Sequence, residues 1–269
     1  MARLHRLVYN PVAYRIVHTP SVRSFLAKYW YPFVTQRDDE ELFINYGYDE
    51  DPPMALPLEA SDEANRYSIQ LYHRTATQTD LSGKRVLEVG CGHGGGASYI
   101  MRTLHPASYT GLDLNPAGVA FCRERHILPG LDFVEGDAED LPFPAESFDA
   151  VINIQSANLY PHFSRFLDEV ARVLRPGGHF LYTDFRPKVR IPEWEEALSD
   201  APMRLVSRTD IEKQVLRGLE NTLKSQPTPR VPRLMRGAAR KAAALQGSWL
   251  QSAVQSGDYA YRIYCFVKE

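Results

Sequence analysis

The chain has 269 residues, of which 44% are hydrophobic and 24% charged, and its formal net charge is -2. These values are typical of a soluble globular protein large enough to bury a core, and they exclude intrinsic disorder and a collagen-like fibre. No apolar run approaches the roughly 18 to 20 residues of a membrane-spanning helix or resembles a secretory leader, so we expect a cytoplasmic protein.

Residues 1–80 contain helical patches broken by prolines, which predict a helical cap rather than a separate sheet domain. Residues 1–37 hold six Arg and Lys and no acid, whereas residues 38–63 hold ten acids and no Arg or Lys. A second acid-free basic stretch covers residues 221–257. The two basic segments are either solvated faces or peripheral contacts with an anionic membrane surface. No nucleic-acid-binding motif accompanies them, so no nucleic acid is expected as a partner.

From residue 84 onward, short runs rich in apolar and β-branched residues alternate with helical segments. The expected strands cover residues 85–89, 109–113, 132–137, 148–154 and 179–184, and the expected helices cover residues 97–104, 117–126 and 163–174. This alternation predicts a parallel sheet joined by right-handed crossovers.

The pattern after residue 184 is more varied. We expect a strand at 203–207, a helix at 209–223, a Pro-, Arg- and Ala-rich helical insertion at about 224–257 and a final strand at 259–267. The last run alternates and is rich in β-branched and aromatic residues, which favours a strand. The expected domain organisation is therefore a cap over residues 1–80 and an α/β domain over residues 81–269.

A glycine-rich turn directly follows the first expected strand, with Gly90, Gly92 and Gly94 at alternate positions. Glycine tolerates positive φ and lets backbone amides approach a ligand, which is typical of a cofactor turn above a parallel sheet. The spacing fits both the dinucleotide fingerprint of nicotinamide-dependent enzymes and the nucleotide turn of S-adenosylmethionine enzymes. Asp113, at the end of the second strand, is placed to accept hydrogen bonds from ribose hydroxyls in either case.

Further segments follow the turn in a fixed order. They are Gly136-Asp137-Ala138, Leu141-Pro142-Phe143, Ser147-Phe148-Asp149 and Leu174-Arg175-Pro176-Gly177-Gly178. Together with the turn and Asp113, this series resembles the class I S-adenosylmethionine-dependent methyltransferases over nearly all of residues 84–184. The resemblance implies an α/β Rossmann-like fold with a seven-stranded, mostly parallel sheet whose last strand is antiparallel. It also implies S-adenosyl-L-methionine as the cofactor and S-adenosyl-L-homocysteine as the product.

Shorter segments indicate one group within this family. They lie at residues 51–54, 56–63, 71–78, 91–96 and 160–163. They are similar to segments of the phthiotriol/phenolphthiotriol dimycocerosates methyltransferases and the related glycopeptidolipid fatty-acid and rhamnosyl O-methyltransferases. Members of this group methylate hydroxyl groups of cell-envelope lipids or their sugars, which implies O-methylation of a lipid or glycolipid acceptor here. One departure is Ala157-Asn158, where the pattern of the phthiotriol enzymes has a Ser-His pair.

The resemblance also implies which residues contact the cofactor. Glu88 and the glycine turn would line its methionine end, and Asp113 would hold its ribose. The expected cofactor-binding residues are Glu88, Gly90, Cys91, Gly92, Gly94, Asp113, Leu114, Asp137, Ala138, Gln155 and Tyr46. Asp137 and the Ala138 backbone would take the adenine. Tyr46 lies in an aromatic stretch similar to one that closes over the cofactor in several methyltransferases, where a ring face attracts the sulfonium; packing within the cap explains it equally well.

An alkyl hydroxyl is a poor nucleophile, so a base that removes its proton should assist methyl transfer, and histidine suits this task at neutral pH. His162 and His93 are therefore the leading candidates for the base, and Asn158 would orient the hydroxyl without taking its proton. The expected acceptor-binding residues are Tyr48, His73, Ser156, Tyr160 and Asp184. Helix capping, turn formation or core packing are the structural alternatives for these side chains.

Other functions remain open from the sequence. The methyl group could go to carbon of a sterol-like or fatty-acid-like substrate, or to a soluble sugar. A nicotinamide-dependent reductase shares the glycine spacing, and a cofactor-binding protein without catalysis is consistent with Asn158 in place of His. Cys91 and His93 are too few ligands for a tetrahedral metal site, so no metal is expected.

Overall fold

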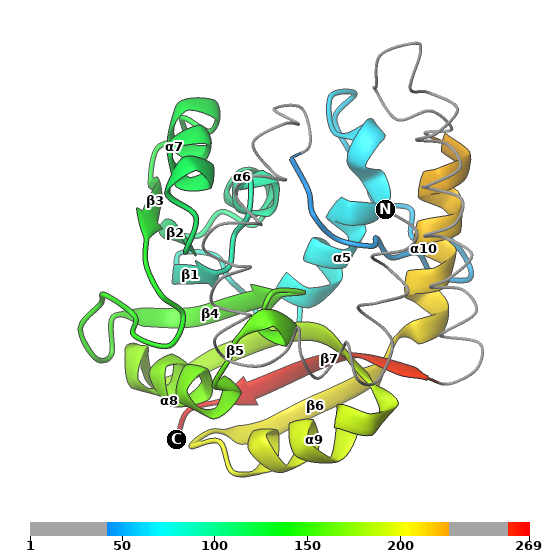
Figure 1. Cartoon of the computed structure of the whole chain (residues 1–269). Helices are drawn as coiled ribbons and strands as arrows, with labels where there is room; N and C mark the ends of the chain where they lie inside the picture. Colours follow the sequence, from blue (N-terminus) through cyan, green and yellow to red (C-terminus); the bar gives the residue numbers. More distant parts are fainter. Residues whose placement is uncertain (1–41, 226–257) are drawn as a thin grey trace.

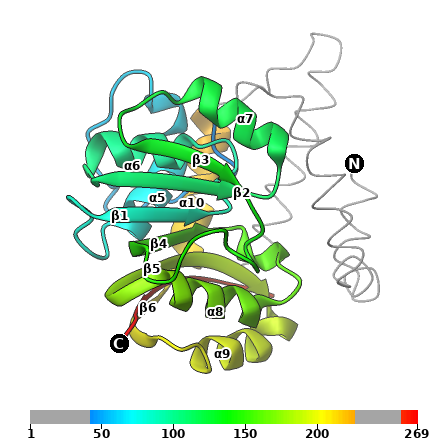
Figure 2. The ribbon, with the colours of Figure 1, turned by 90° about the vertical axis from the view of Figure 1, so that its left-hand side faces the viewer.

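The computed structural model describes residues 42–225 and 258–269, which are built on a seven-stranded sheet (Figure 1). The strands are β1 (Arg85–Val89), β2 (Ser108–Asp113), β3 (Leu131–Glu135), β4 (Phe148–Ile154), β5 (Leu174–Pro187), β6 (Arg204–Asp210) and β7 (Tyr259–Val267). Their order across the sheet is β3-β2-β1-β4-β5-β7-β6, and Figure 2 shows the first five following one another in this order.

Within this sheet, β7 is the strand that runs against its neighbours. β1 pairs in parallel with β2 and β4, as do β2 with β3 and β4 with β5. β7 lies antiparallel between β5 and β6. The predicted fold is thus confirmed, including the antiparallel last strand. Val86, Leu87 and Val89 of β1 are all buried, because a central parallel strand is covered on both faces and needs a continuous apolar run.

Helices cover both faces of the sheet (Figures 1 and 2). They are α5 (Arg66–Ala76), α6 (Gly95–Thr103), α7 (Pro116–Arg125), α8 (Phe163–Val173), α9 (Ile191–Ser199) and α10 (Glu212–Ser225), with short 3-10 turns η2 (Glu63–Asn65), η3 (Ala157–Leu159) and η4 (Lys188–Arg190). α5, α6, α7 and α10 contribute to one hydrophobic core, and α8 and α9 contribute to the other. The fold therefore has three layers.

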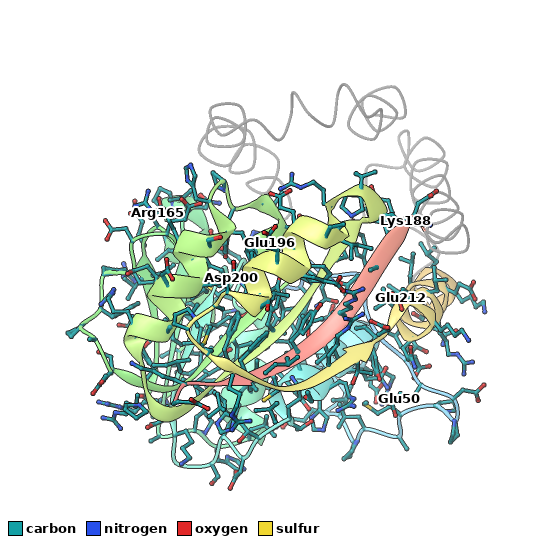
Figure 3. All side chains as sticks on the ribbon, turned by 90° about the horizontal axis from the view of Figure 1, so that it is seen from below. Glu50, Arg165, Lys188, Glu196, Asp200 and Glu212 are labelled. Carbon is teal, nitrogen blue, oxygen red and sulfur yellow. The ribbon has the colours of Figure 1, made fainter. Side chains whose placement is uncertain are left out.

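The sequence of α8 explains how a helix docks on the sheet. Phe166, Leu167, Val170 and Ala171 are buried, and their spacing places them on one face of a helix. Burying each large apolar side chain contributes about 1.5 to 3 kcal/mol. Arg165 lies on the opposite, solvent-facing side, as Figure 3 shows.

Some element boundaries differ from those expected from the sequence. β6 was expected at 203–207 and the following helix at 209–223, but the strand continues to Asp210 because its pairing with β7 reaches Arg262. β5 begins before the predicted 179–184 strand, since Leu174 already pairs with Phe148 ahead of a register shift. In each case the partner strand, distant in sequence, sets the boundary.

The segment before the first strand shares its core with the sheet. Phe43, Tyr48, Ile69 and Leu71 belong to the same buried cluster as Val86 of β1. A cap that begins at residue 1 and the insertion at about 224–257 lie mostly outside the described residues, so both stay predictions, as does membrane contact of residues 1–37. Among the residues that the structure describes, no helix is long and apolar enough to cross a membrane.

Candidate active site

The carboxyl ends of β1, β2, β4 and β5 meet at one edge of the sheet because these strands are parallel. Most of the predicted site residues follow these strand ends. They are Gly90, Cys91, Gly92, His93 and Gly94 after β1, Asp113 and Leu114 at β2, Gln155, Ser156, Asn158 and Tyr160 after β4, and Asp184 on β5. This edge is therefore the candidate active site.

The glycine turn has the backbone conformation that its sequence predicts. Gly90 and Gly94 have φ of 78° and 74°, in the left-handed region that favours glycine. The Gly90 and Cys91 amides donate to the Leu112 carbonyl at 2.7 and 3.1 Å, and Gly94 caps α6. A Cβ at Gly90 would overlap the Ser156 side chain. The turn is thus held closely against both neighbouring strand ends.

Asp113 links the turn to the end of β2. Its Oδ2 accepts from the Gly92 amide at 2.9 Å and its Oδ1 from the Asn115 amide at 3.0 Å. Burial raises the pKa of the Asp113 carboxyl, and the backbone donors oppose this rise. Each carboxylate oxygen has two acceptor positions, so these contacts leave capacity for ribose hydroxyls.

Glu88 lies beneath the turn and not in the opening. Its side chain is 1% exposed, and its two oxygens accept from the hydroxyls of Tyr72 on α5 and Tyr109 on β2, both at 2.9 Å. Burial raises the pKa of Glu88 to about 7, although both tyrosine hydrogen bonds lower it. Glu88, predicted to line the methionine end, is thus buried near the end of β1 with both carboxylate oxygens bonded to tyrosine hydroxyls, and its role toward the cofactor stays a prediction.

This burial predicts a pH dependence of stability. Because the pKa of Glu88 rises from 4.5 in the unfolded chain to about 7 in the folded protein, the folded state binds more protons between these pH values. Stability should fall as pH rises through this window, by up to about 3 kcal/mol. Glu88→Gln should remove this contribution, since an amide does not titrate there.

Chemical denaturation of wild type and Glu88→Gln between pH 4.5 and 8 measures this difference. Glu124→Gln, at an exposed position on α7, is the matched control and should keep the wild-type slope. If Glu88→Gln also keeps the wild-type pH dependence, the carboxyl does not titrate in this window and the prediction is wrong.

The residues predicted for the adenine lie on the outer side of this edge. Asp137 is exposed and its Oδ1 accepts from the Glu139 amide at 2.9 Å, whereas Ala138 is buried. Leu114 follows Asp113 and is 44% exposed, which is unusual for a large apolar side chain. The adenine roles of Asp137, Ala138 and Leu114 therefore stay predictions.

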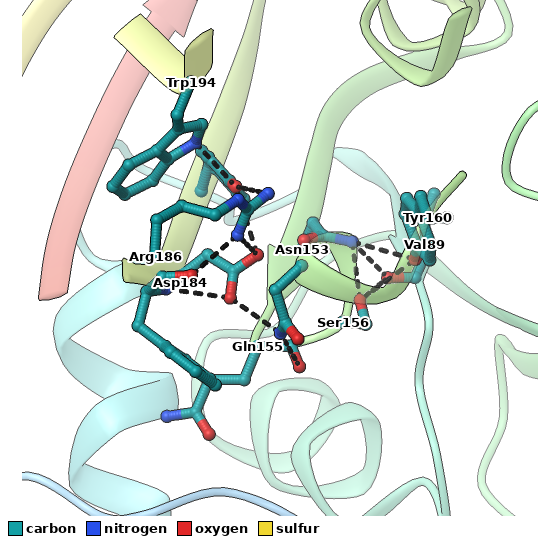
Figure 4. Close-up of polar contacts among 11 residues, drawn as sticks. Val89, Asn153, Gln155, Ser156, Tyr160, Asp184, Arg186 and Trp194 are labelled. Atoms are coloured by element: carbon teal, nitrogen blue, oxygen red, sulfur yellow. Dashed lines mark hydrogen bonds and ion pairs between the residues drawn. The ribbon is translucent and has the colours of Figure 1, made fainter. Parts of the chain in front are cut away.

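A buried ion pair lies on β5 near its carboxyl end (Figure 4). Asp184 is fully buried and accepts from Arg186 Nη1 at 2.7 Å and from Asn158 Nδ2 at 3.0 Å. Asn158 Nδ2 also donates to the Gln155 carbonyl at 3.0 Å, so both sides of its amide nitrogen have protein partners. Gln155 itself has a φ of 54°, and such strain in a residue other than glycine is concentrated at functional sites.

Tyr46 and Tyr48 are placed differently. The Tyr46 amide contacts Gln155 Oε1 at 3.3 Å, and its ring lies 5.7 Å from that of Phe185, so Tyr46 reaches the ends of β4 and β5. Tyr48 is buried, and its hydroxyl donates to Glu50 Oε1 at 2.7 Å. Burial and this partner raise the pKa of Tyr48. Of the two, the structure brings Tyr46 to the site.

The predicted histidines do not converge. His162 is the N-cap residue of α8 and has a half-exposed side chain, and its Nδ1 lies 2.7 Å from Glu139 Oε2. His93 is buried in the turn, with its ring 5.2 Å from that of Phe121 on α7. His73 is a residue of α5, and its Nδ1 is 2.8 Å from the hydroxyl of Tyr99 on α6. His93 is the histidine that belongs to the turn.

Some residues of the site were not singled out from the sequence. Asn153 is fully buried within β4 and contacts Ser156 and Tyr160, and Arg186 pairs with Asp184. An Asn inside the apolar run of a central strand is a signal that sequence analysis can use, because buried polar groups need partners. Within residues 42–225 and 258–269, no group of three His, Cys, Asp or Glu side chains could hold a metal ion.

The chain is similar in sequence to known methyltransferases. The family model described as "Methyltransferase domain" matches residues 87–182. The chain is 57% identical to the phthiotriol/phenolphthiotriol dimycocerosates methyltransferase of Mycobacterium tuberculosis over 247 residues, which cover 90% of this chain and 92% of that protein. It is 56% identical over 249 residues to the fatty-acid O-methyltransferase of Mycolicibacterium smegmatis, covering 88% of each.

Solved structures show the same fold at low sequence identity. The [4+2]-cyclase SpnF has a TM-score of 0.68 at 22% identity, covering 93% of this chain and 96% of that chain. The geranyl diphosphate C-methyltransferase of Streptomyces coelicolor, solved with S-adenosyl-L-homocysteine, has a TM-score of 0.64 at 16% identity and covers 92% and 97%. At these identities the likeness concerns the fold alone.

Proposed function

We propose, from the premise that this chain belongs to the family of the phthiotriol/phenolphthiotriol dimycocerosates methyltransferases, that it transfers a methyl group from S-adenosylmethionine to a hydroxyl of a lipid or glycolipid. The observation that carries the proposal is the 57% identity over nine-tenths of both chains. The chain is a methyltransferase by the same relationship, and the proposal concerns its methyl donor and its acceptor.

The residues at the candidate site fit this cofactor. The space beside Gly90 admits no Cβ, and the turn follows a parallel strand directly, as a nucleotide turn requires. Asp113, held by the Gly92 and Asn115 amides, would bind the ribose hydroxyls. When bound, the cofactor supplies a methyl carbon activated by a sulfonium. The protein's task is then to align the acceptor oxygen and exclude water.

The acceptor would approach between the ends of β4 and β5. Asn158, fixed by Asp184 and the Gln155 carbonyl, would orient the acceptor hydroxyl, and the Tyr46 ring would border the cofactor. For the proton acceptor we place His93 ahead of His162, because His93 belongs to the turn whereas His162 pairs with Glu139 at an exposed helix start.

A fatty-acid carboxyl is the second acceptor class. The 56% identity to a fatty-acid O-methyltransferase favours it. An ionised carboxylate is also a nucleophile without a base, which would suit a site with Asn158 in place of a histidine. The product is then a methyl ester instead of a methyl ether.

The test is incubation of the purified protein with methyl-deuterated S-adenosylmethionine and three separate acceptors: a long-chain diol, a long-chain fatty acid and a rhamnolipid. We expect a product carrying one deuterated methyl on oxygen. Alkaline hydrolysis then separates an ester, which loses the label, from an ether, which keeps it. Heat-denatured protein is the control. Label found on carbon, or on none of these lipids, would overturn the proposal.

A further inference from the structure

The carbonyl that ends β1 is surrounded by polar side chains from β4 and the loop after it (Figure 4). Asn153 Nδ2 lies 2.8 Å from the Val89 carbonyl, 2.7 Å from Ser156 Oγ and 3.1 Å from the Tyr160 hydroxyl. Ser156 Oγ is 3.2 Å from the same carbonyl and 3.0 Å from the Tyr160 hydroxyl. Asn153 and Ser156 therefore contact the last residue before Gly90, and the Tyr160 hydroxyl contacts both of them.

We propose that Asn153, Ser156 and Tyr160 form a clamp that positions the glycine turn. Ser156 and Tyr160 then support the cofactor site and do not bind the acceptor. The inference rests on the proposed function, because it assigns these residues within the same site. Asn153 is a positioning residue, since it acts through the turn.

The hydrogen-bonding capacity of Ser156 is used by Val89 and by the other two members of the clamp. A hydroxyl has one donor and two acceptor positions. Ser156 Oγ donates to the Val89 carbonyl and accepts from Asn153, and the Tyr160 hydroxyl completes its shell. Burial raises the pKa of Tyr160, which keeps its hydroxyl protonated as a donor. An acceptor substrate would have to break these bonds to bind Ser156.

The orientation of the Asn153 amide is also determined. Turning it over would place Oδ1 against the Val89 carbonyl, with two acceptors facing each other. In the present orientation Oδ1 is buried without a partner among the described residues, which carries a cost. Nδ2 has two hydrogens, which it shares among the Val89 carbonyl, Ser156 Oγ and the Tyr160 hydroxyl, and these contacts offset that cost.

The clamp packs closely against the glycine turn. The Cβ that Gly90 lacks would overlap the Ser156 side chain and approach the Tyr160 hydroxyl to 2.8 Å. The Tyr160 ring is held in turn by Phe166 of α8, with ring centroids 4.9 Å apart. On its other side, the turn donates from the Gly90 and Cys91 amides to the Leu112 carbonyl of β2. The turn is therefore held between β2 and the clamp.

The test uses Ser156→Ala and Tyr160→Phe, each of which removes one hydroxyl, and two measurements on the full-length protein. The affinity for S-adenosyl-L-homocysteine should fall about five- to tenfold, because each substitution removes a buried hydrogen bond that positions the turn. The KM for the acceptor should stay within about twofold of wild type. In the ligand-free protein, amide hydrogen exchange of the turn should accelerate.

Tyr264→Phe is the matched control, because it removes a buried hydroxyl that contacts Arg262 far from the turn. It should leave the affinity for S-adenosyl-L-homocysteine and the exchange of the turn unchanged. A raised KM for the acceptor with unchanged affinity for S-adenosyl-L-homocysteine would overturn the clamp and return Ser156 and Tyr160 to the acceptor-binding residues. Unchanged exchange of the turn would also overturn it. If the wild type does not bind S-adenosyl-L-homocysteine, the proposed function fails, and the exchange measurement still decides the clamp.

Discussion

Asp184→Ala should lower the free energy of unfolding by about 3 to 5 kcal/mol, because it leaves the Arg186 guanidinium buried without its carboxylate. The Asp184 and Arg186 side chains are 0% and 8% exposed, and their contact measures 2.7 Å. The same carboxylate also accepts from the Tyr182 hydroxyl and the Phe185 amide. Because both side chains are buried, water does not replace these contacts in the folded protein.

Thermal denaturation should show this loss as a decrease in Tm of about 10 °C. The double variant Asp184→Ala/Arg186→Met removes both charges and should be more stable than Asp184→Ala alone, since no unpaired charge stays buried. Arg186 also stacks over Phe163 and Trp194, at 5.1 and 5.0 Å from their centroids, so the double variant should not reach wild-type stability. If the single variant is as stable as wild type, the ion pair does not hold this edge together.

Asp113→Ala should weaken binding of S-adenosyl-L-homocysteine by about 1.5 to 3 kcal/mol, or roughly ten- to a hundredfold. The substitution removes the partner proposed for the ribose and also the acceptor of the Gly92 amide. Asp168→Ala, at an exposed position on α8, is the control and should bind like wild type. Equal affinity of Asp113→Ala and wild type would remove Asp113 from the site.

The positions of most strands and of the glycine turn could be predicted because their signals are local, whereas the seven-stranded sheet with its antiparallel last strand followed from the family resemblance. The short apolar strand Arg85–Val89 is followed directly by glycines with positive φ. Both features can therefore be recognised within about ten residues of sequence. Asp113 follows the same rule, since it stands where a parallel strand ends. Local chain chemistry determines which residues reach the edge of the sheet.

The directions of the side chains at that edge could not be predicted, because their partners are distant in sequence. His162 bonds to Glu139, which is 23 positions away in sequence. Asn153 and Ser156 donate to the Val89 carbonyl, which is 64 and 67 positions away. Glu88 turns beneath the glycines because Tyr72 and Tyr109 meet there. Such pairings depend on the register between strands and helices.

A calorimetric titration of the wild-type protein with S-adenosyl-L-homocysteine, beside NADH and NADPH under the same conditions, tests the central claim most directly. The account predicts that S-adenosyl-L-homocysteine binds at a single site with micromolar affinity and that neither nicotinamide cofactor binds. Binding of a nicotinamide cofactor without binding of S-adenosyl-L-homocysteine would contradict the assignment of the glycine turn, and with it the methyl donor proposed here.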